Sequence, residues 1–318
     1  MNSLNYASQA EKGLKRTVFA FYKAAYNLSG SRMGKMREMI KDAVHFQLPE
    51  NGNILSDQLN GLKGLPARLP FPLITASYHC DNLSEFHEDA PEYVPKRMII
   101  ATENVGIYFP ELYMELRILN KDEVDNGITL FCINGTPEGD WVPDAFGWFM
   151  PHQWESRSDS IPVEPLTPKK PGSPRMVGLP ILALPEIVQL RAKETGMSRA
   201  VKEMTHDIGQ SVSALLEMCE ALSCSNVKHE PIEHIDPAMN AKRIKDGKSP
   251  LYETRILVLD GEKKQFTSMS QQGNHKSPRQ HLRRGHIRRL DTKNIWINSC
   301  VVGDSANGII EKSYLIKG

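Results

Sequence analysis

SRAVKEMTHDIGQSVSALLEMCEALSC, the stretch from Ser198 to Cys224, carries the clearest helical pattern in the chain. Its apolar side chains recur at intervals of three and four residues and trace one stripe, formed by Val201, Met204, Ile208, Val212, Leu215, Cys219 and Leu222. That period is typical of an amphipathic helix with one buried face. We therefore expect a long helix here that covers one face of a β-sheet.

Short β-branched or aromatic runs, separated by Pro, Gly, Asn and Asp, predict the strands of that sheet. Before the helix they are Pro72–Tyr78, Arg97–Thr102, Leu112–Leu119, Gly127–Ile133 and Ala145–Met150. After it they are Leu251–Leu259, Asn294–Val302 and Ile309–Ile316, with a turn at Val302–Gly308. Strands on both sides of the helix favour one α+β body, in which an antiparallel sheet packs against the long helix.

The N-terminal residues 5–47 have helical periodicity, and Leu28–Ser31 predicts a break between two helices. The second, over about Ser31–Phe46, carries an apolar stripe that is more typical of a core than of a binding groove, formed by Met33, Met36, Ile40 and Val44. We expect residues 1–50 to form a helical appendage and a candidate contact for a homo-oligomer. Residues 65–318 then form the body, with a long loop at about 155–180 and a basic C-terminal sheet region at 240–318.

Composition limits the class of protein. Of 318 residues, 24% are charged and 40% are hydrophobic, as in soluble globular proteins. No apolar stretch approaches the roughly 18–20 residues that span a bilayer, and the start has no signal-peptide pattern, so we expect no membrane contact. The five cysteines are scattered and form no C-x-x-C pair, which favours reduced thiols in the cytoplasm.

Motifs that would name a reaction are missing. The chain has no P-loop, no dinucleotide-binding glycine motif, no G-x-S-x-G and no H-E-x-x-H. Its His, Cys and acidic residues at 79–89 and 229–236 match no zinc spacing. We therefore predict neither a metal nor a cofactor. Three of the four tryptophans lie at 141–154, where they predict either a partner-binding patch or, as we favour, a corner of the core.

Charge is distributed unevenly along the chain. Residues 240–318 contain 16 Lys and Arg against 7 Asp and Glu, a net charge of +9, whereas the whole chain carries +1. The first 239 residues therefore carry −8. This asymmetry predicts either an anionic partner for the basic end or pairing between the two parts.

The densest positive charge lies in SPRQHLRRGHIRRL, residues 277–290, which holds five arginines and two histidines. Arginine suits phosphate binding because its planar guanidinium donates two parallel hydrogen bonds. The candidate phosphate-binding residues of this run are Arg279, Arg283, Arg284, Arg288 and Arg289. Lys242 and Arg243 would extend the same positive surface if the strands are neighbours. The alternative is an edge hairpin whose arginines pair with acidic residues of the body.

His281 and His286 are weak candidates for the acid and base of a metal-independent RNA cleavage. Their spacing of five places them on one face of neither a helix nor a strand. Gly285 between them could turn the chain and change that.

Four segments together resemble a family of uncharacterised proteins encoded by tailed bacteriophages and prophages. They are Leu69-Pro70-Phe71-Pro72, Asn240-x-Lys242-Arg243 with Gly247-Lys248-x-Pro250-Leu251-Tyr252-Glu253, Ser277-Pro278-Arg279-x-His281-x-Arg283-Arg284-Gly285-His286-x-Arg288-Arg289, and Trp296 with Val302-Gly303-Asp304 and Gly308. The resemblance covers about residues 65–318 and is most specific over 240–318. It implies a phage protein in the cytoplasm of an infected bacterium, but no activity or catalytic residue. Phage proteins of this kind often bind nucleic acid or act in host takeover.

Three functions remain open on this evidence. The first, which we favour, is nucleic-acid binding, to DNA or RNA, by the basic C-terminal hairpin. The second is a protein–protein inhibitor or adaptor that docks an acidic protein surface of a host enzyme or defence system. The third is an enzyme that cleaves RNA or a nucleotide.

Overall fold

The computed structural model describes residues 5–54, 68–80, 96–120, 127–136, 139–152, 178–204, 208–259, 279–283, 286–297, 300–302 and 304–309. The chain divides into two compact units, Met1–Glu220 with His229–Leu257 and Ala221–Lys228 with Val258–Gly318. This division differs from the expected boundaries, an appendage over 1–50 and a single body over 65–318.

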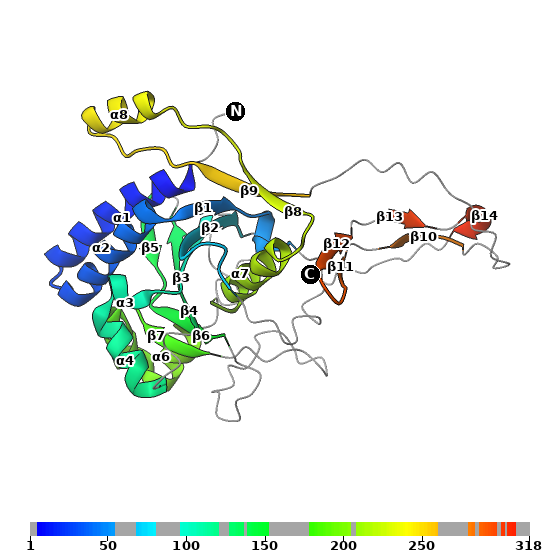
Figure 1. The fold of residues 1–318 in the computed structure, drawn as a ribbon. Helices are drawn as coiled ribbons and strands as arrows, with labels where there is room; N and C mark the ends of the chain where they lie inside the picture. Colours follow the sequence, from blue (N-terminus) through cyan, green and yellow to red (C-terminus); the bar gives the residue numbers. More distant parts are fainter. Residues whose placement is uncertain are drawn as a thin grey trace. The chain divides into compact units, whose positions relative to one another are not determined.

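A mixed nine-stranded β-sheet lies at the centre of the first unit (Figure 1). Its order is β7-β6-β4-β3-β2-β1-β9-β8, and β5 pairs with β4. The strands are β1 Val44–Gln47, β2 Leu73–His79, β3 Lys96–Thr102, β4 Gly127–Gly135, β5 Trp141–Pro143, β6 Phe146–Pro151, β7 Leu179–Leu182, β8 Val227–Pro231 and β9 Thr254–Leu259. Strands β2, β3, β4, β6 and β7 pair antiparallel, whereas β1 runs parallel to β2 and β9. The α+β class is confirmed, and the prediction of an antiparallel sheet is wrong.

Strand β1, which pairs parallel with both neighbours, makes the sheet mixed rather than antiparallel. The sequence pattern assigns it to the end of the second helix, because Met36, Ile40 and Val44 continue a spacing of four. The helix instead ends at Asp42, and Val44–Gln47 pairs with strands distant in the chain. His45 and Phe46 point to opposite faces of the sheet, and both are buried. Four residues that directly follow a helix and continue its spacing are too few to show a strand pattern of their own.

The predicted N-terminal helical hairpin is confirmed as α1 (Tyr6–Lys23) and α2 (Asn27–Asp42). The break lies earlier than expected, at Ala25, which has a left-handed φ of 63°. Helix α2 starts earlier because Glu186 caps it: the carboxylate accepts hydrogen bonds from the backbone N–H groups of Leu28 and Ser29, at 2.9 and 3.0 Å.

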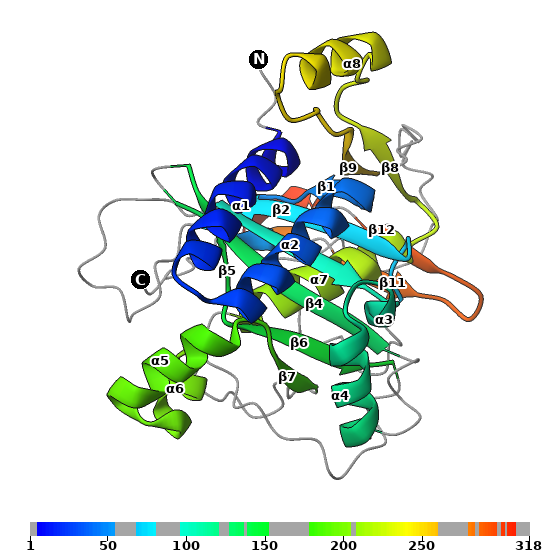
Figure 2. The ribbon, with the colours of Figure 1, turned by 90° about the vertical axis from the view of Figure 1, so that its left-hand side faces the viewer.

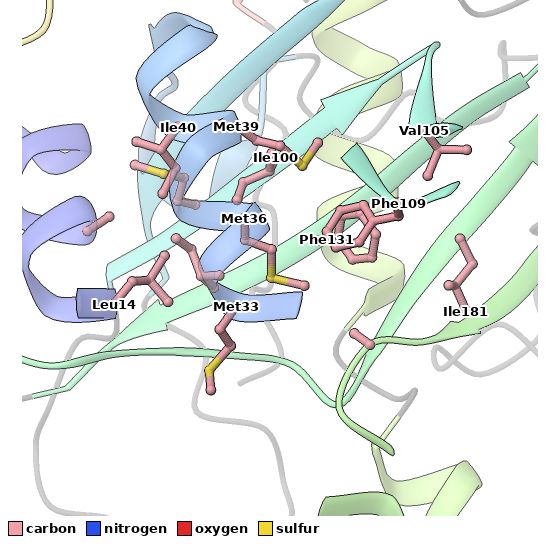
Figure 3. Close-up of a cluster of buried hydrophobic side chains, with 14 of the residues drawn as sticks. Leu14, Met33, Met36, Met39, Ile40, Ile100, Val105, Phe109, Phe131 and Ile181 are labelled. Carbon is pink, nitrogen blue, oxygen red and sulfur yellow. The ribbon is translucent and has the colours of Figure 1, made fainter. Parts of the chain in front are cut away.

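The hairpin packs on one face of the sheet (Figure 2) and shares a core with it (Figure 3). Met33, Met36 and Ile40 are fully buried there, which confirms the core interpretation of the methionine stripe. Trp141 and Trp148 are buried as well, as favoured for the tryptophan segment, whereas Trp154 lies outside the described residues. The rest of that shared core includes Leu14, Met39, Ile100, Val105, Phe109, Phe131 and Ile181.

One predicted strand, Leu112–Leu119, is wrong, because this stretch lies in helix α4 (Pro110–Asn120), which follows α3 (Val105–Tyr108). Leu112 and Leu116, four residues apart, are buried, while Met114 is half exposed. This is a helical period, and a proline at the helix start agrees with it.

Helix α7 (Ile208–Leu222) covers the opposite face of the sheet (Figure 1). The hydroxyls of Tyr78 on β2 and Ser211 on α7 lie 3.1 Å apart. Helices α5 (Pro185–Thr195) and α6 (Met197–Met204) precede it. Residues 205–207 lie outside the described residues, so a continuous helix over 198–224 remains a prediction.

Small sheets make up the second unit: β13-β10-β14 and the pair β11-β12. Their strands are β10 Arg279–Arg283, β11 His286–Arg289, β12 Asn294–Ile297, β13 Cys300–Val302 and β14 Asp304–Ile309. The turn predicted at Val302–Gly308 is wrong, because β14 lies there and pairs with β10. The predicted loop at 155–180 lies outside the described residues up to residue 177. None of the helices described has the length and apolarity needed to cross a membrane.

Candidate nucleic-acid interface

The basic run lies on two strands that belong to different sheets. Strand β10 carries Arg279, His281 and Arg283, and β11 carries His286, Arg288 and Arg289. Arg284, between the strands, lies outside the described residues. The structure therefore does not bring the whole run together as one strand or one ribbon.

The two histidines have separate register partners. His281 pairs with Val302 of β13, whereas His286 pairs with Ile297 of β12. An acid–base pair needs both groups within reach of one reacting bond. Placement on two sheets gives no support to that role for His281 and His286.

Strands β11 and β12 form an antiparallel hairpin with a tight turn. The backbone N–H of Leu290 donates to the carbonyl of Lys293 at 2.9 Å, which leaves Asp291 and Thr292 as the turn residues. Register pairs place Ile287 opposite Trp296, Arg288 opposite Ile295 and Arg289 opposite Asn294. Neighbouring residues of a strand point to opposite faces, so Arg288 and Arg289 emerge on the two sides of the hairpin.

Both arginines are exposed, as is Lys293 in the turn. Asp291 is the acidic residue of this hairpin sequence, from His286 to Ile297. Three cations against one carboxylate give the hairpin an excess of positive charge, with one arginine on each face. Such a surface attracts polyanions.

The outer edge of β12 is pinned to the segment that follows α7 within the same unit. Asn226 holds the backbone of Trp296 twice: its side-chain amide donates to the Trp296 carbonyl, and its oxygen accepts from the Trp296 N–H, both at 2.8 Å. The Ser225 N–H donates to the Asn294 carbonyl at 2.9 Å. These bonds replace a third strand and fix the hairpin before any ligand arrives.

Lys242 and Arg243 lie on α8 (Pro237–Lys245), in the first unit. The Arg243 Nε donates to the Ser249 carbonyl at 3.1 Å, so this guanidinium already bonds its own segment. Lys242 is exposed. The two groups of cations proposed as one surface thus belong to different units.

Several charged groups that are not among the predicted site residues lie in the interior of the first unit. Arg97 is 6% exposed and donates to Asn134 at 3.0 Å, and Asn134 donates in turn to Asp144 at 2.6 Å. These bonds join β3, β4 and the segment before β6 on the α7 face. The sequence shows Arg97 inside a predicted strand, but the partners of its side chain depend on the register of the sheet and follow from no local pattern.

A second group of polar side chains lies on the face of the sheet that the α1–α2 helical hairpin covers. Glu11 of α1 pairs with Arg37 of α2 at 2.6 Å. Burial, together with the charge of Glu11, raises the pKa of the Tyr252 hydroxyl. His45 contacts the Thr75 hydroxyl through Nδ1 at 2.7 Å and lies edge-on to the Tyr252 ring. Burial lowers the pKa of His45 to about 4, so it is neutral at pH 7. These contacts hold the helices and β1 together.

No protein-family model, no curated protein and no solved structure matches this chain. Within the described residues, no cluster of three or more His, Cys, Asp or Glu side chains is placed to hold a metal ion.

Proposed function

We propose that this protein binds nucleic acid through the β11–β12 hairpin. The observation that carries the proposal is the exposure of Arg288 and Arg289 on opposite faces of a hairpin whose far edge is pinned by Asn226 and Ser225. Guanidinium groups on both faces can contact phosphates on both sides of a groove. Pinning lowers the entropy lost on binding, because the ribbon is already ordered.

Shape favours double-stranded DNA over double-stranded RNA as the ligand. The major groove of B-form DNA is about 12 Å wide and admits a two-stranded β-ribbon. The major groove of A-form RNA is deep and too narrow for side chains to read. Arg279, Arg283 and Arg284 lie just before the hairpin in sequence and would add phosphate contacts.

The resemblance to tailed-phage proteins agrees with this proposal. It would place the protein in the cytoplasm of an infected bacterium, where binding to phage or host nucleic acid could serve host takeover. The competing partner is an acidic protein surface, which would also attract Arg288 and Arg289.

Fluorescence anisotropy tests the proposal with labelled duplex DNA, duplex RNA and polyglutamate as probes. We expect duplex DNA to bind most tightly and the Arg288→Ala/Arg289→Ala variant to lose on the order of 100-fold in affinity at 50 mM salt, as expected for charge-assisted hydrogen bonds. The matched control is Lys12→Ala/Lys15→Ala, which removes two exposed cations from α1.

Two results would overturn the proposal. One is equal affinity of the hairpin variant and the control for duplex DNA. The other is polyglutamate binding as tightly as DNA at equal charge concentration, which would instead indicate an acidic protein as the partner.

A further inference from the structure

Helix α8 has no buried residue. It lies in the connection between β8 and β9, beyond that edge of the sheet of its unit (Figure 2). A helix of nine residues is too short to be stable alone in water, and α8 lacks the apolar burial that normally compensates. Other interactions must therefore maintain it.

Side-chain hydrogen bonds on one side of α8, from Asn240 and Arg243, lock the helix to the backbone of residues 249–251. Asn240 holds the backbone of Leu251 twice, donating to its carbonyl at 2.7 Å and accepting from its N–H at 2.8 Å. Arg243, one turn on, donates to the Ser249 carbonyl. Asp236 caps the first turn by accepting from the Ala238 N–H at 2.9 Å, and Gly247 closes the far end with a left-handed φ of 70°.

The face opposite the locks carries cations and small residues. It is formed by positions related by three, four and seven residues, which lie on one side of a helix: Ala238, Ala241, Lys242 and Lys245. All four are exposed. The exposed apolar residues lie nearer the locks, because Met239 is four residues from Arg243 and Ile244 is four residues from Asn240.

We propose that this lysine–alanine face of α8 is a second nucleic-acid contact, which binds backbone phosphates and reads no bases. Alanines beside the lysines let a phosphate backbone approach the helix closely. Lysine is a strongly hydrated point charge that suits phosphates, and it is depleted in the cores of protein–protein interfaces. A protein partner would be expected to need an aromatic or arginine anchor, and this face has none among its four residues.

The inference rests on the proposed function but uses different residues in a different unit. Each contact is too small to bind tightly alone. Two contacts on one chain raise each other's effective concentration on a single nucleic acid, so losing either weakens the whole. Because α8 contacts only phosphates, its loss should weaken binding equally for all sequences.

The test measures duplex DNA binding by anisotropy between 50 and 200 mM salt for the full chain and for Lys242→Ala/Lys245→Ala. Each lost phosphate contact lowers the salt slope by about 0.9. Across this fourfold range of salt, two contacts correspond to about a tenfold larger loss of affinity for the wild type than for the variant. Lys12→Ala/Lys15→Ala is again the matched control, and circular dichroism checks that the variants remain folded.

The outcomes separate the two proposals. If the α8 variant matches the control while the hairpin variant loses affinity, the α8 contact is overturned and the hairpin stands. If the α8 variant loses slope and the hairpin variant does not, α8 is the contact and the proposed hairpin site is wrong. An α8 variant that loses polyglutamate binding as strongly as DNA binding would contradict the nucleic-acid assignment of this face.

Discussion

The two units of the chain use arginine in opposite ways. In the first unit Arg32 and Arg97 are 3% and 6% exposed and bond protein groups, Arg32 with the Leu182 carbonyl and Arg97 with Asn134. In the second unit Arg288 and Arg289 are exposed on a two-stranded hairpin. Burying a guanidinium requires protein partners, and Arg32 and Arg97 have them. Arg288 and Arg289 are exposed, so anions in solution can reach them. Exposure, rather than the number of arginines, distinguishes a binding role from a structural one.

The largest effect is expected from Arg32→Met, which should lower the free energy of unfolding. This residue lies 3.5 Å from Glu115 and 3.8 Å from Glu111, and it bonds the Leu182 carbonyl. Glu111 and Glu115 are half exposed and stay solvated. Arg32→Met removes a charge-assisted hydrogen bond and leaves the Leu182 carbonyl without this donor, which costs about 3 kcal/mol. Urea unfolding should show this loss, while Arg288→Ala/Arg289→Ala should change the free energy of unfolding by less than about 0.5 kcal/mol. Equal stability losses in both variants would remove the contrast.

Acid should destabilise the interior through His45. Its pKa is about 4 in the folded protein, against about 6.5 when unfolded. Between these values the unfolded chain binds more protons, so stability falls as the pH is lowered from about 6.5 to 4, by about 3 kcal/mol. Urea unfolding across this range should show a shallower pH dependence for His45→Gln. The same dependence in both proteins would show that His45 does not titrate in this way.

Releasing the hairpin edge should weaken binding without changing charge. Asn226→Ala removes both bonds to the Trp296 backbone, and each is worth about 1 kcal/mol. If part of this free energy serves to order the unbound hairpin, its loss should lower the affinity for duplex DNA about fivefold. The slope of log K against log salt should stay constant. The exposed Asn53→Ala is the matched control. A changed slope would mean that Asn226 affects the phosphate contacts themselves.

The smallest expected effect is a gain. Asp291→Asn removes the carboxylate of the hairpin turn, next to exposed Lys293. Exposed charge interactions are worth about 0.5 kcal/mol, so affinity for duplex DNA should rise about twofold at low salt and less at high salt. A decrease in affinity would indicate that Asp291 orders the turn.

Local periodicity predicted the elements whose burial is one-sided or continuous. The hairpin α1–α2 and strands β2, β3, β4, β6 and β9 lie where the sequence predicts them. It failed at β1 because this four-residue strand directly follows α2 and continues the helix's spacing of four. It failed at α4 because Leu112–Leu119 is also an apolar run of strand length. It also placed the break of the first hairpin too late, since the cap comes from Glu186, far along the chain.

The candidate site was predicted in residue type but not in arrangement. Composition alone identifies the basic run, yet it does not show that β10 and β11 belong to different sheets. Nor does it show that Arg243 bonds Ser249, or that Lys245, which is not among the predicted site residues, is exposed on the same helix as Lys242. The side chains that hold both cationic elements are asparagines, Asn226 and Asn240, whose partners lie outside any local pattern.

The most direct test of the central claim is the salt dependence of duplex DNA binding by the wild type and by Arg288→Ala/Arg289→Ala. If both arginines contact phosphates, the slope of log K against log salt becomes shallower by about 1.8 in the variant, while Lys12→Ala/Lys15→Ala keeps the wild-type slope. Parallel lines for all three proteins would contradict nucleic-acid binding by the β11–β12 hairpin.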